Sequence, residues 1–236
     1  MKDDTIYYLD DETISNQALI EEYIYPNKEL NYYWSDDFSP QFYQKLATAG
    51  FITTTMYDMQ DKLVLLPEIQ FDYAVLDFSN LHISKKVKKL LKTKTYEFRL
   101  NHNLKAVLDA IENYHETSWV VEEYKTILIN LSQQNSDQFQ IMSIELYDTK
   151  TNRLIAGEVG YKIGATYTSL TGFFTKEKTY NNWGKLQLVL LGQYLEKNHY
   201  DFWNLGHASL QYKIDLGAHV LNREQFLQRW KESIKK

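Results

Sequence analysis

The chain has 236 residues, of which 44% are hydrophobic and 15% aromatic, enough for the core of one large or two modest globular domains. It contains no cysteine, which excludes disulfides, thiolate nucleophiles and thiolate metal sites, and its six histidines lack metal-ligand spacing. The formal net charge of -5 argues against a protein that coats nucleic acid nonspecifically, although a local basic patch could still contact phosphates.

The hydrophobic residues do not form a membrane-spanning run, since no apolar stretch reaches the ~18 residues that a membrane helix needs. We therefore expect a soluble, cytoplasmic protein with no membrane partner. We also expect a monomer that holds no metal and no bound cofactor.

The N-terminal part of the chain alternates between helix and strand signals. Cap residues and apolar spacing predict two helices, over residues 16–25 and 39–50, the second capped by Ser39 with Pro40 in its first turn. Runs of β-favouring residues predict three short strands, over residues 51–55, 63–66 and 73–78. The second strand is expected to end at Pro67, because proline cannot donate a ladder hydrogen bond.

One basic cluster stands out, in the segment KKVKKLLKTK that follows Ser84. Ser84 can cap a helix whose apolar stripe consists of Val87, Leu90 and Leu91, so that lysines surround the stripe. Lysines on one helix can contact successive phosphates, whereas the alternative is an ordinary solvated helix face. The candidate RNA-binding residues on this helix are Lys85, Lys88, Lys89 and Lys92.

The C-terminal part begins with a predicted strand over residues 96–100 and helices over residues 104–111 and 119–131. Further elements are predicted in the order strand, hairpin, helix, strand and helix, at residues 139–147, 153–174, 183–196, 201–205 and after Asn222. Three antiparallel strands, a helix and another strand is the core order of GNAT-type N-acyltransferases, in which the helix packs beneath the sheet. We predict an α/β (α+β) fold of this type, with a small N-terminal α/β domain over residues 1–75 and a GNAT-like domain over residues 76–236.

The segment RLIAGEVGYKIGATYTSLTGFF at residues 153–174 is typical of a β-hairpin that reverses at Gly164-Ala165, with both arms buried. Gly157, Gly160 and Gly172 lie inside its arms, where glycine weakens a strand. Two explanations stay open. The glycines let a ligand or another backbone approach closely, or they relieve crowding at a bulge or twist.

The segments SPQFYQKLATAG at residues 39–50 and LHISKKVKKL at residues 81–90 resemble two motifs of the leucyl/phenylalanyl-tRNA–protein transferases. The similarity continues in order through residues 118–124, the glycine-rich hairpin, residues 182–185 and the LGA segment with Arg223, and it covers about residues 39 to 230. The resemblance implies a small N-terminal domain, a GNAT-fold C-terminal domain, and transfer of an aminoacyl group from tRNA to the N-terminal amine of a protein.

The chain departs from this family at positions that the resemblance aligns with the family's chemistry. The family's Asp-x-Gln appears as Asn-Leu-Gly at residues 204–206, and asparagine can hydrogen-bond but cannot titrate. The family's hairpin glutamate corresponds to Leu170, and its tryptophan and methionine pocket residues correspond to Thr54, Glu158 and Gly172. A charge at Glu158 and lost packing surface at Gly172 predict a pocket that no longer prefers leucine or phenylalanine.

Three residues are candidate catalytic groups. Asn204 would orient the attacking amine, and either His207 or Glu158 would take its proton, because imidazole titrates near neutrality and a buried carboxylate must be paired, hydrated or neutralised. The alternatives are a loop histidine without a role and a strand-end glutamate that reaches solvent. The candidate substrate-binding residues are Gly157, Leu170, Gly172, Phe173, Trp119 and Tyr212.

The function expected from these observations is that of an aminoacyl-tRNA–protein transferase-like enzyme with a specificity different from Leu/Phe. Its donor would be aminoacyl-tRNA and its acceptor the N-terminus of a protein or peptide. An acyl-CoA-dependent GNAT N-acyltransferase is one alternative, but the usual pyrophosphate loop, Q/R-x-x-G-x-G/A, is not present at residues 180–185. A noncatalytic binding protein that retains the scaffold is the other, because Asn204 replaces an acid.

Overall fold

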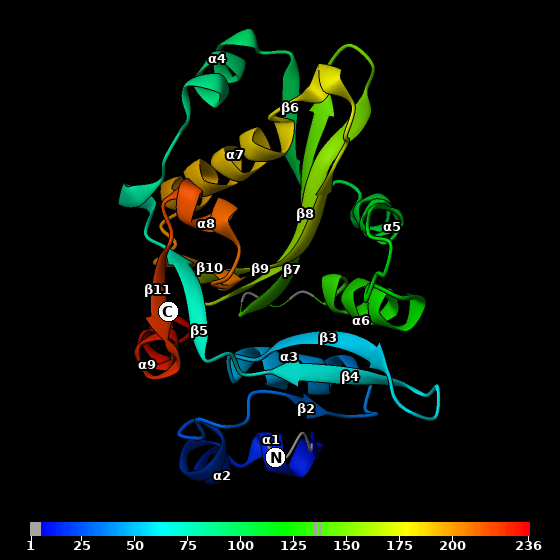
Figure 1. Cartoon of the computed structure of the whole chain (residues 1–236), viewed down its shortest axis with the longest axis vertical. Helices are drawn as coiled ribbons and strands as arrows, with labels where there is room; N and C mark the ends of the chain where they lie inside the picture. Colours follow the sequence, from blue (N-terminus) through cyan, green and yellow to red (C-terminus); the bar gives the residue numbers. More distant parts are fainter. Residues whose placement is uncertain (1–5, 135, 137) are drawn as a thin grey trace.

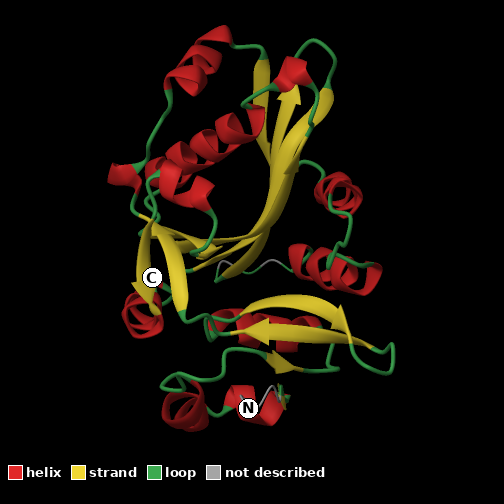
Figure 2. Ribbon diagram, viewed as in Figure 1, coloured by secondary structure: helices red, strands yellow, loops and turns green. Residues whose placement is uncertain are grey.

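The computed structural model describes residues 6–134, 136 and 138–236, and within them the largest element is a seven-stranded mixed sheet with helices on both faces (Figure 1; Figure 2). The strands lie side by side in the order β11-β5-β10-β9-β8-β7-β6. Neighbouring strands run antiparallel, except that β9 and β10 are parallel. Their bounds are β5 (Asp72–Leu76), β6 (Tyr96–Leu100), β7 (Phe139–Asp148), β8 (Arg153–Ile163), β9 (Thr166–Phe174), β10 (Phe202–His207) and β11 (His219–Asn222).

Helices cover both faces of the large sheet. On one face α7 (Trp183–Lys197) packs against β7 to β10 and carries α4 (Lys85–Thr93) on its outer side, whereas α5 (Leu104–Tyr114) and α6 (Glu122–Ser132) cover the other face (Figure 1). After β5, the other helical segments are α8 (Gln211–Leu216), α9 (Arg223–Ser233) and the 3-10 turns Phe78–Asn80 and Lys178–Tyr180. Within the described ranges, no helix is both long and apolar enough to span a membrane.

The core order predicted from the sequence is confirmed. β7, β8 and β9 are three consecutive antiparallel strands of one sheet, and α7 then leads to the parallel strand β10. The hairpin between β8 and β9 reverses at Gly164, which adopts the left-handed conformation with φ 52°. The protein therefore has the α/β class and the GNAT-type arrangement of strands and helix that the sequence predicts.

The N-terminal part forms a smaller layer beside α6 (Figure 1). Its centre is an antiparallel hairpin of β3 (Ile52–Tyr57) and β4 (Leu63–Glu68), and α3 (Pro40–Thr48) packs against β3 and α6. The predicted cap of α3 is present, since Ser39 Oγ accepts a hydrogen bond from the Phe42 N–H at 3.3 Å. The other elements of this layer are β1 (Tyr7–Tyr8), α1 (Asp11–Ser15), α2 (Gln17–Leu19), the π-helical turn Ile20–Ile24 and β2 (Tyr33–Trp34).

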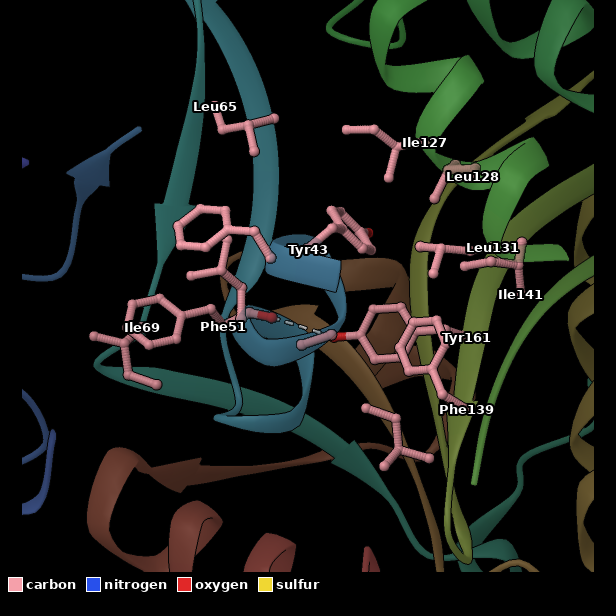
Figure 3. Packing of buried hydrophobic residues seen from close by; sticks show 14 of the residues in the cluster. Tyr43, Phe51, Leu65, Ile69, Ile127, Leu128, Leu131, Phe139, Ile141 and Tyr161 are labelled. Carbon is pink, nitrogen blue, oxygen red and sulfur yellow. Dashed lines mark hydrogen bonds between the residues drawn. The ribbon is translucent and has the colours of Figure 1, made fainter. Parts of the chain in front are cut away.

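One hydrophobic cluster joins this layer to the large sheet (Figure 3). The hydroxyls of Tyr43 in α3 and Tyr124 in α6 share a hydrogen bond of 2.8 Å, and Tyr161 of β8 donates a 3.2 Å hydrogen bond to the carbonyl of Phe51. Because buried hydroxyls need partners, these bonds fix the position of the β3–β4 hairpin as well as satisfying the tyrosines. The hairpin is thereby held against the sheet at the place where the site lies.

β5 spans the boundary predicted at residue 75. The sequence places this strand at the end of the N-terminal domain, whereas it pairs with β10 and β11 inside the large sheet. The reason is the run Tyr73 to Leu76, which is fully buried and therefore suits a central strand covered on both faces. The division into domains 1–75 and 76–236 stays a prediction.

β9 and β10 diverge soon after they meet. Residues 166–168 pair with residues 202–204, and β10 then shifts register against β5 between Asn204 and Gly206. Gly206 has a φ of 73°, a conformation that favours glycine. The diverging strands leave a gap in the sheet, and side chains from several elements converge on it.

Candidate functional site

A cavity of about 660 Å³ lies where β9 and β10 diverge. Its walls come from the β3–β4 hairpin, from β8, β9 and β10, from the start of α7, and from α8. Binding sites for small molecules commonly have volumes of about 300–1,000 Å³. Segments far apart in the sequence thus meet around a space of suitable size for a small-molecule ligand.

The structure brings to this cavity eight of the nine residues that the sequence suggests as catalytic or substrate-binding. These eight are Glu158, His207, Gly157, Leu170, Gly172, Phe173, Trp119 and Tyr212. They come from β8, β9, β10, α8 and the loop before α6, so their meeting depends on the fold. Their individual roles stay predictions.

Asn204, the ninth candidate, is not among the residues that line the cavity. Its side chain is 1% exposed and bonds within the sheet, where Oδ1 accepts the Gly206 N–H at 3.0 Å and Nδ2 donates to Thr168 Oγ1 at 3.3 Å. These bonds stabilise the register shift of β10 at the point where it leaves β9. In this arrangement Asn204 shapes the cavity from behind its wall.

Glu158 places a buried carboxylate in the cavity wall. Its side chain accepts three hydrogen bonds, from Ser169 Oγ at 2.7 Å and Tyr167 Oη at 3.0 Å on one oxygen and from Gln187 Nε2 at 3.3 Å on the other. Burial raises the pKa of Glu158 above its ordinary value, although these hydrogen bonds and the charge of Lys213 oppose the shift. The carboxyl is therefore well held by the protein and still borders the space where a ligand would lie.

The hairpin glycines serve the close approach of two strands. A Cβ on Gly172 would lie 2.7 Å from the carbonyl oxygen of Gly157 and 2.9 Å from Cβ of Glu158, and one on Gly160 would lie 2.3 Å from the carbonyl oxygen of Thr168. The approach of another backbone therefore accounts for these glycines, and crowding at a bulge also applies to Gly160, which lies at the register shift of β8 against β9. Gly172 lines the cavity, and a side chain there would require the backbone of β8 to shift, so the expectation that Gly172 removes packing surface from the pocket stays a prediction.

Lys213 contributes a buried amine to the same cavity. The residue is 5% exposed, and its Nζ donates a hydrogen bond of 2.8 Å to the carbonyl oxygen of His207. Burial lowers the pKa of Lys213 to about 8, although the negative charge of Glu158 acts in the opposite direction. The cavity thus contains a lysine that can change its protonation state near neutral pH.

His207 lies half-exposed at the edge of the cavity and faces a buried carboxylate. Its Nε2 is 3.0 Å from Oε2 of Glu68, and the other oxygen of Glu68 accepts a hydrogen bond of 2.8 Å from Asn31 Nδ2. Gln70 Nε2 also donates to Glu68, at 3.4 Å, whereas Gln70 Oε1 is a buried polar atom without a partner in the described part of the chain. The contact with Glu68 fixes the orientation of the imidazole ring.

The candidate RNA-binding lysines lie on α4, outside the cavity lining. The predicted cap is present, since Ser84 Oγ accepts the Val87 N–H at 3.3 Å, and Val87 is buried beneath the helix. Across the ranges that the structure describes, the α4 lysines are not among the residues that form ion pairs. The exposed residues on this helix and its C-cap Lys94 are Lys85, Lys86, Lys88, Lys89, Lys92, Thr93 and Lys94.

Several residues in or behind the cavity wall have no signal in the sequence. A register shift between Val159 and Gly160 gives β9 an extra residue opposite β8, and this brings Tyr167 and Ser169 to the side of Glu158, which simple alternation does not predict. Lys213 and Glu68 reach the cavity only through tertiary packing. No group of three or more metal-binding side chains is found in the part of the chain that the structure describes.

Comparison with known proteins adds a family to this geometry. The model of the family described as leucyl/phenylalanyl-tRNA protein transferase matches residues 75–231. A leucyl/phenylalanyl-tRNA–protein transferase from Rubrobacter xylanophilus is 26% identical over 162 residues, covering 69% of this chain and 79% of the relative. Another, from Colwellia psychrerythraea, is 22% identical over 170 residues, covering 69% of this chain and 66% of the relative.

Among solved structures, the chain is similar to FemX at 7% identity with a TM-score of 0.48, covering 89% of this chain and 75% of FemX. The family match over residues 75–231 includes β8, β9, β10, α7 and α8, which form most of the cavity. The resemblance first noted in the motifs of the sequence is therefore confirmed, and the chain belongs to the leucyl/phenylalanyl-tRNA–protein transferase family.

Proposed function

We propose that this protein transfers an aminoacyl group from a tRNA to the N-terminal amine of a protein or peptide, and that the amino acid it prefers is neither leucine nor phenylalanine. Membership in the family supports an aminoacyltransferase that uses charged tRNA. The altered preference rests on one observation, the buried carboxylate of Glu158 in the cavity wall.

A buried carboxylate disfavours an apolar guest. An ionised carboxylate offers about four acceptor positions, and the protein fills three of them at Glu158. A guest that carries a hydrogen-bond donor or a positive charge can fill the remaining position, whereas a leucine or phenylalanine side chain would remove water without replacing its hydrogen bond. The cavity thus favours a polar or cationic aminoacyl group.

The lysines of α4 supply the second part of this proposal, the contact with tRNA. They project from a helix that packs on α7. They form a basic cluster in a chain whose formal net charge is -5, so a phosphate contact would have to be local. Lys85, Lys88, Lys89 and Lys92 follow the spacing of one helix face, which suits a phosphate backbone lying across it.

The test is to charge tRNA with different amino acids and to follow transfer to peptides that begin with Arg or Lys. We expect transfer of arginine, lysine or glutamine to exceed that of leucine or phenylalanine by about tenfold or more, the size of one charge-assisted hydrogen bond. Glu158→Leu should reverse this preference. Glu145→Gln is the matched control, because Glu145 is an equally buried carboxylate on the neighbouring strand β7 but does not line the cavity.

Two results would contradict the proposal in different ways. Efficient leucine or phenylalanine transfer that is unchanged in Glu158→Leu would refute the altered preference and leave the transferase activity in place. No transfer from any charged tRNA would refute the activity itself and favour a binding protein that retains the scaffold.

A further inference from the structure

We propose that Lys213 is a catalytic residue of the aminoacyl transfer, and that its amine takes the proton lost by the acceptor amine and returns it to the departing ribose oxygen. This inference rests on the proposed function, because it assigns a role within that reaction. The motifs that carry the family resemblance do not include this lysine.

The backbone around Lys213 fixes its amine at the cavity. In α8, the Lys213 N–H donates to the Leu210 carbonyl and the Lys213 carbonyl accepts the Ala218 N–H, both at 3.0 Å. At the far end of the side chain, Nζ donates to the carbonyl of His207 at 2.8 Å. A Cβ on Gly206 would lie 3.9 Å from Nζ, which places the amine beside the strand that borders the gap.

The hydrogen bonds of Lys213 suit both protonation states. A neutral amine has two N–H groups and one lone pair, whereas an ammonium has three N–H groups. The bond to the His207 carbonyl uses one N–H in either state. The neutral form can therefore accept a proton from a group in the cavity, and the charged form can donate to an oxygen in the same place.

Other titratable groups line the same cavity. They are Glu68 of β4, Glu158 of β8, His207 of β10, Tyr212 of α8, Tyr114 of α5, Lys185 of α7 and His115, and of the nitrogen bases among them His207, His115 and Lys185 are exposed. The Glu158 oxygens accept three hydrogen bonds, and the Nε2 of His207 faces Glu68 at 3.0 Å. Among these groups, Lys213 is the buried nitrogen base that keeps capacity for a substrate.

The acidity of Lys213 matches that of the group it would deprotonate. Burial lowers the pKa of Lys213 to about 8, and the α-amino group of a peptide has an ordinary pKa of about 7.7–8.0. Proton transfer between groups of similar pKa near the working pH is efficient, and a positioned base contributes about 10²–10⁴-fold to a rate. This agreement supports the role that the geometry assigns.

The step conserves atoms and charge. The acceptor nitrogen attacks the ester carbonyl carbon, so that a C–N bond forms while the C–O bond to the ribose breaks. One proton moves from the acceptor nitrogen to Nζ of Lys213, and Lys213 delivers a proton to the ribose oxygen. Amine and ester become amide and alcohol, and the lysine ends in the state in which it began.

The test is chemical rescue of Lys213→Ala. We expect this variant to lose about 10²–10³-fold in kcat/KM, and trimethylamine to restore part of the rate. Trimethylamine has a basic nitrogen but, as a tertiary amine, cannot become a stable acylated product. Tetramethylammonium has a similar size and a positive charge but no lone pair, so it should not restore the rate.

A structural role would give different results. Lys213→Met should lose the same kcat/KM but should not be rescued by trimethylamine, because the methionine side chain fills the space that the lysine leaves. Lys105→Met on α5 is the control for removal of an exposed lysine. Equal rescue by trimethylamine and tetramethylammonium would overturn the proton-transfer role in favour of a purely electrostatic one. Unchanged kcat/KM in Lys213→Ala would overturn any catalytic role and leave the transferase function intact, whereas no transfer by the unaltered protein would refute both.

A second measurement does not depend on activity. The ¹⁵Nζ resonance of Lys213, assigned by its loss in Lys213→Met, should titrate with a midpoint near pH 8. A midpoint near the ordinary value of 10.5 would overturn the assignment, because the amine would then be protonated throughout the working range.

Discussion

At the scale of single residues, the cavity is defined by two buried ionisable groups of opposite sign. Burial raises the pKa of Glu158 and lowers that of Lys213, so that water exclusion moves both groups toward their neutral forms. Within the described residues the two groups do not form an ion pair with each other, because the Glu158 oxygens accept from Ser169, Tyr167 and Gln187 and the Lys213 amine donates to the His207 carbonyl. Groups with pKa values shifted by burial in a cavity are typical of functional sites.

The buried lysine has a measurable cost to stability. Its pKa is about 8 in the folded protein and about 10.5 in the unfolded chain. Below pH 8 both states are protonated and the folded state bears the cost of the buried charge, so the unfolding free energy should rise as the pH rises from 8 to 10.5.

Lys213→Met should remove this dependence and raise the unfolding free energy at pH 7 by about 2 kcal/mol, the burial cost less one hydrogen bond. Urea unfolding of both proteins across this pH range measures the difference, which should shrink toward high pH. A difference that stays constant from pH 7 to pH 10.5 would contradict the shifted pKa.

At the scale of elements, the sequence predicts the hairpin, the α4 and α7 helices and the core order β7, β8, β9, α7 and β10, because caps, turns and periodicity are local. It does not predict that β5 lies between β10 and β11. It does not predict that β4 continues through Pro67 to Glu68. Proline is tolerated there because the strand belongs to a two-stranded sheet, and this extension is what delivers Glu68 to His207. The part of the site that depends on register shifts and long-range packing is the part that local patterns miss.

The α4 helix gives a prediction about RNA. Reversing the charge of Lys85, Lys88 and Lys92 to glutamate should weaken tRNA binding by about tenfold or more and reduce its dependence on salt, since each lysine at a phosphate releases a counterion. Filter binding at several salt concentrations measures both quantities.

A matched control for this experiment is the triple substitution of Lys45, Lys62 and Lys105 to glutamate. The amines of these lysines already form ion pairs elsewhere on the surface. If the α4 variant and this control weaken binding equally, the helix has no special role and the effect is one of net charge.

At the scale of the whole molecule, Arg223 ties the C-terminal helix to the N-terminal layer. Its guanidinium donates to the backbone carbonyls of residues 24, 27, 30, 69 and 70. The guanidinium carbon also lies 4.6 Å from the centroid of the Phe71 ring. The planar guanidinium of arginine carries five N–H donors on three nitrogens and can bond several carbonyls at once, whereas the single ammonium nitrogen of a lysine cannot reach all of them. The resemblance includes this arginine as a family position, and the structure gives it a role in holding the two layers together.

Arg223→Lys should therefore lower the unfolding free energy by about 3 kcal/mol, because several buried carbonyls lose their donor although the charge is retained. Arg153→Lys, at an exposed ion pair with Glu177, should change it by no more than about 0.5 kcal/mol. Thermal unfolding of the two variants provides the comparison. Equal effects would show that the fork of Arg223 contributes nothing beyond its charge.

The place of β5 between β10 and β11 has a consequence for synthesis of the chain. β5 ends at Leu76, whereas its partners begin at Phe202 and His219. During translation the apolar strand emerges early and has no hydrogen-bonding partner until nearly the whole polypeptide has left the ribosome. We therefore expect β5 to join the large sheet late, and until then its apolar strand has unpaired backbone groups that can pair with another chain.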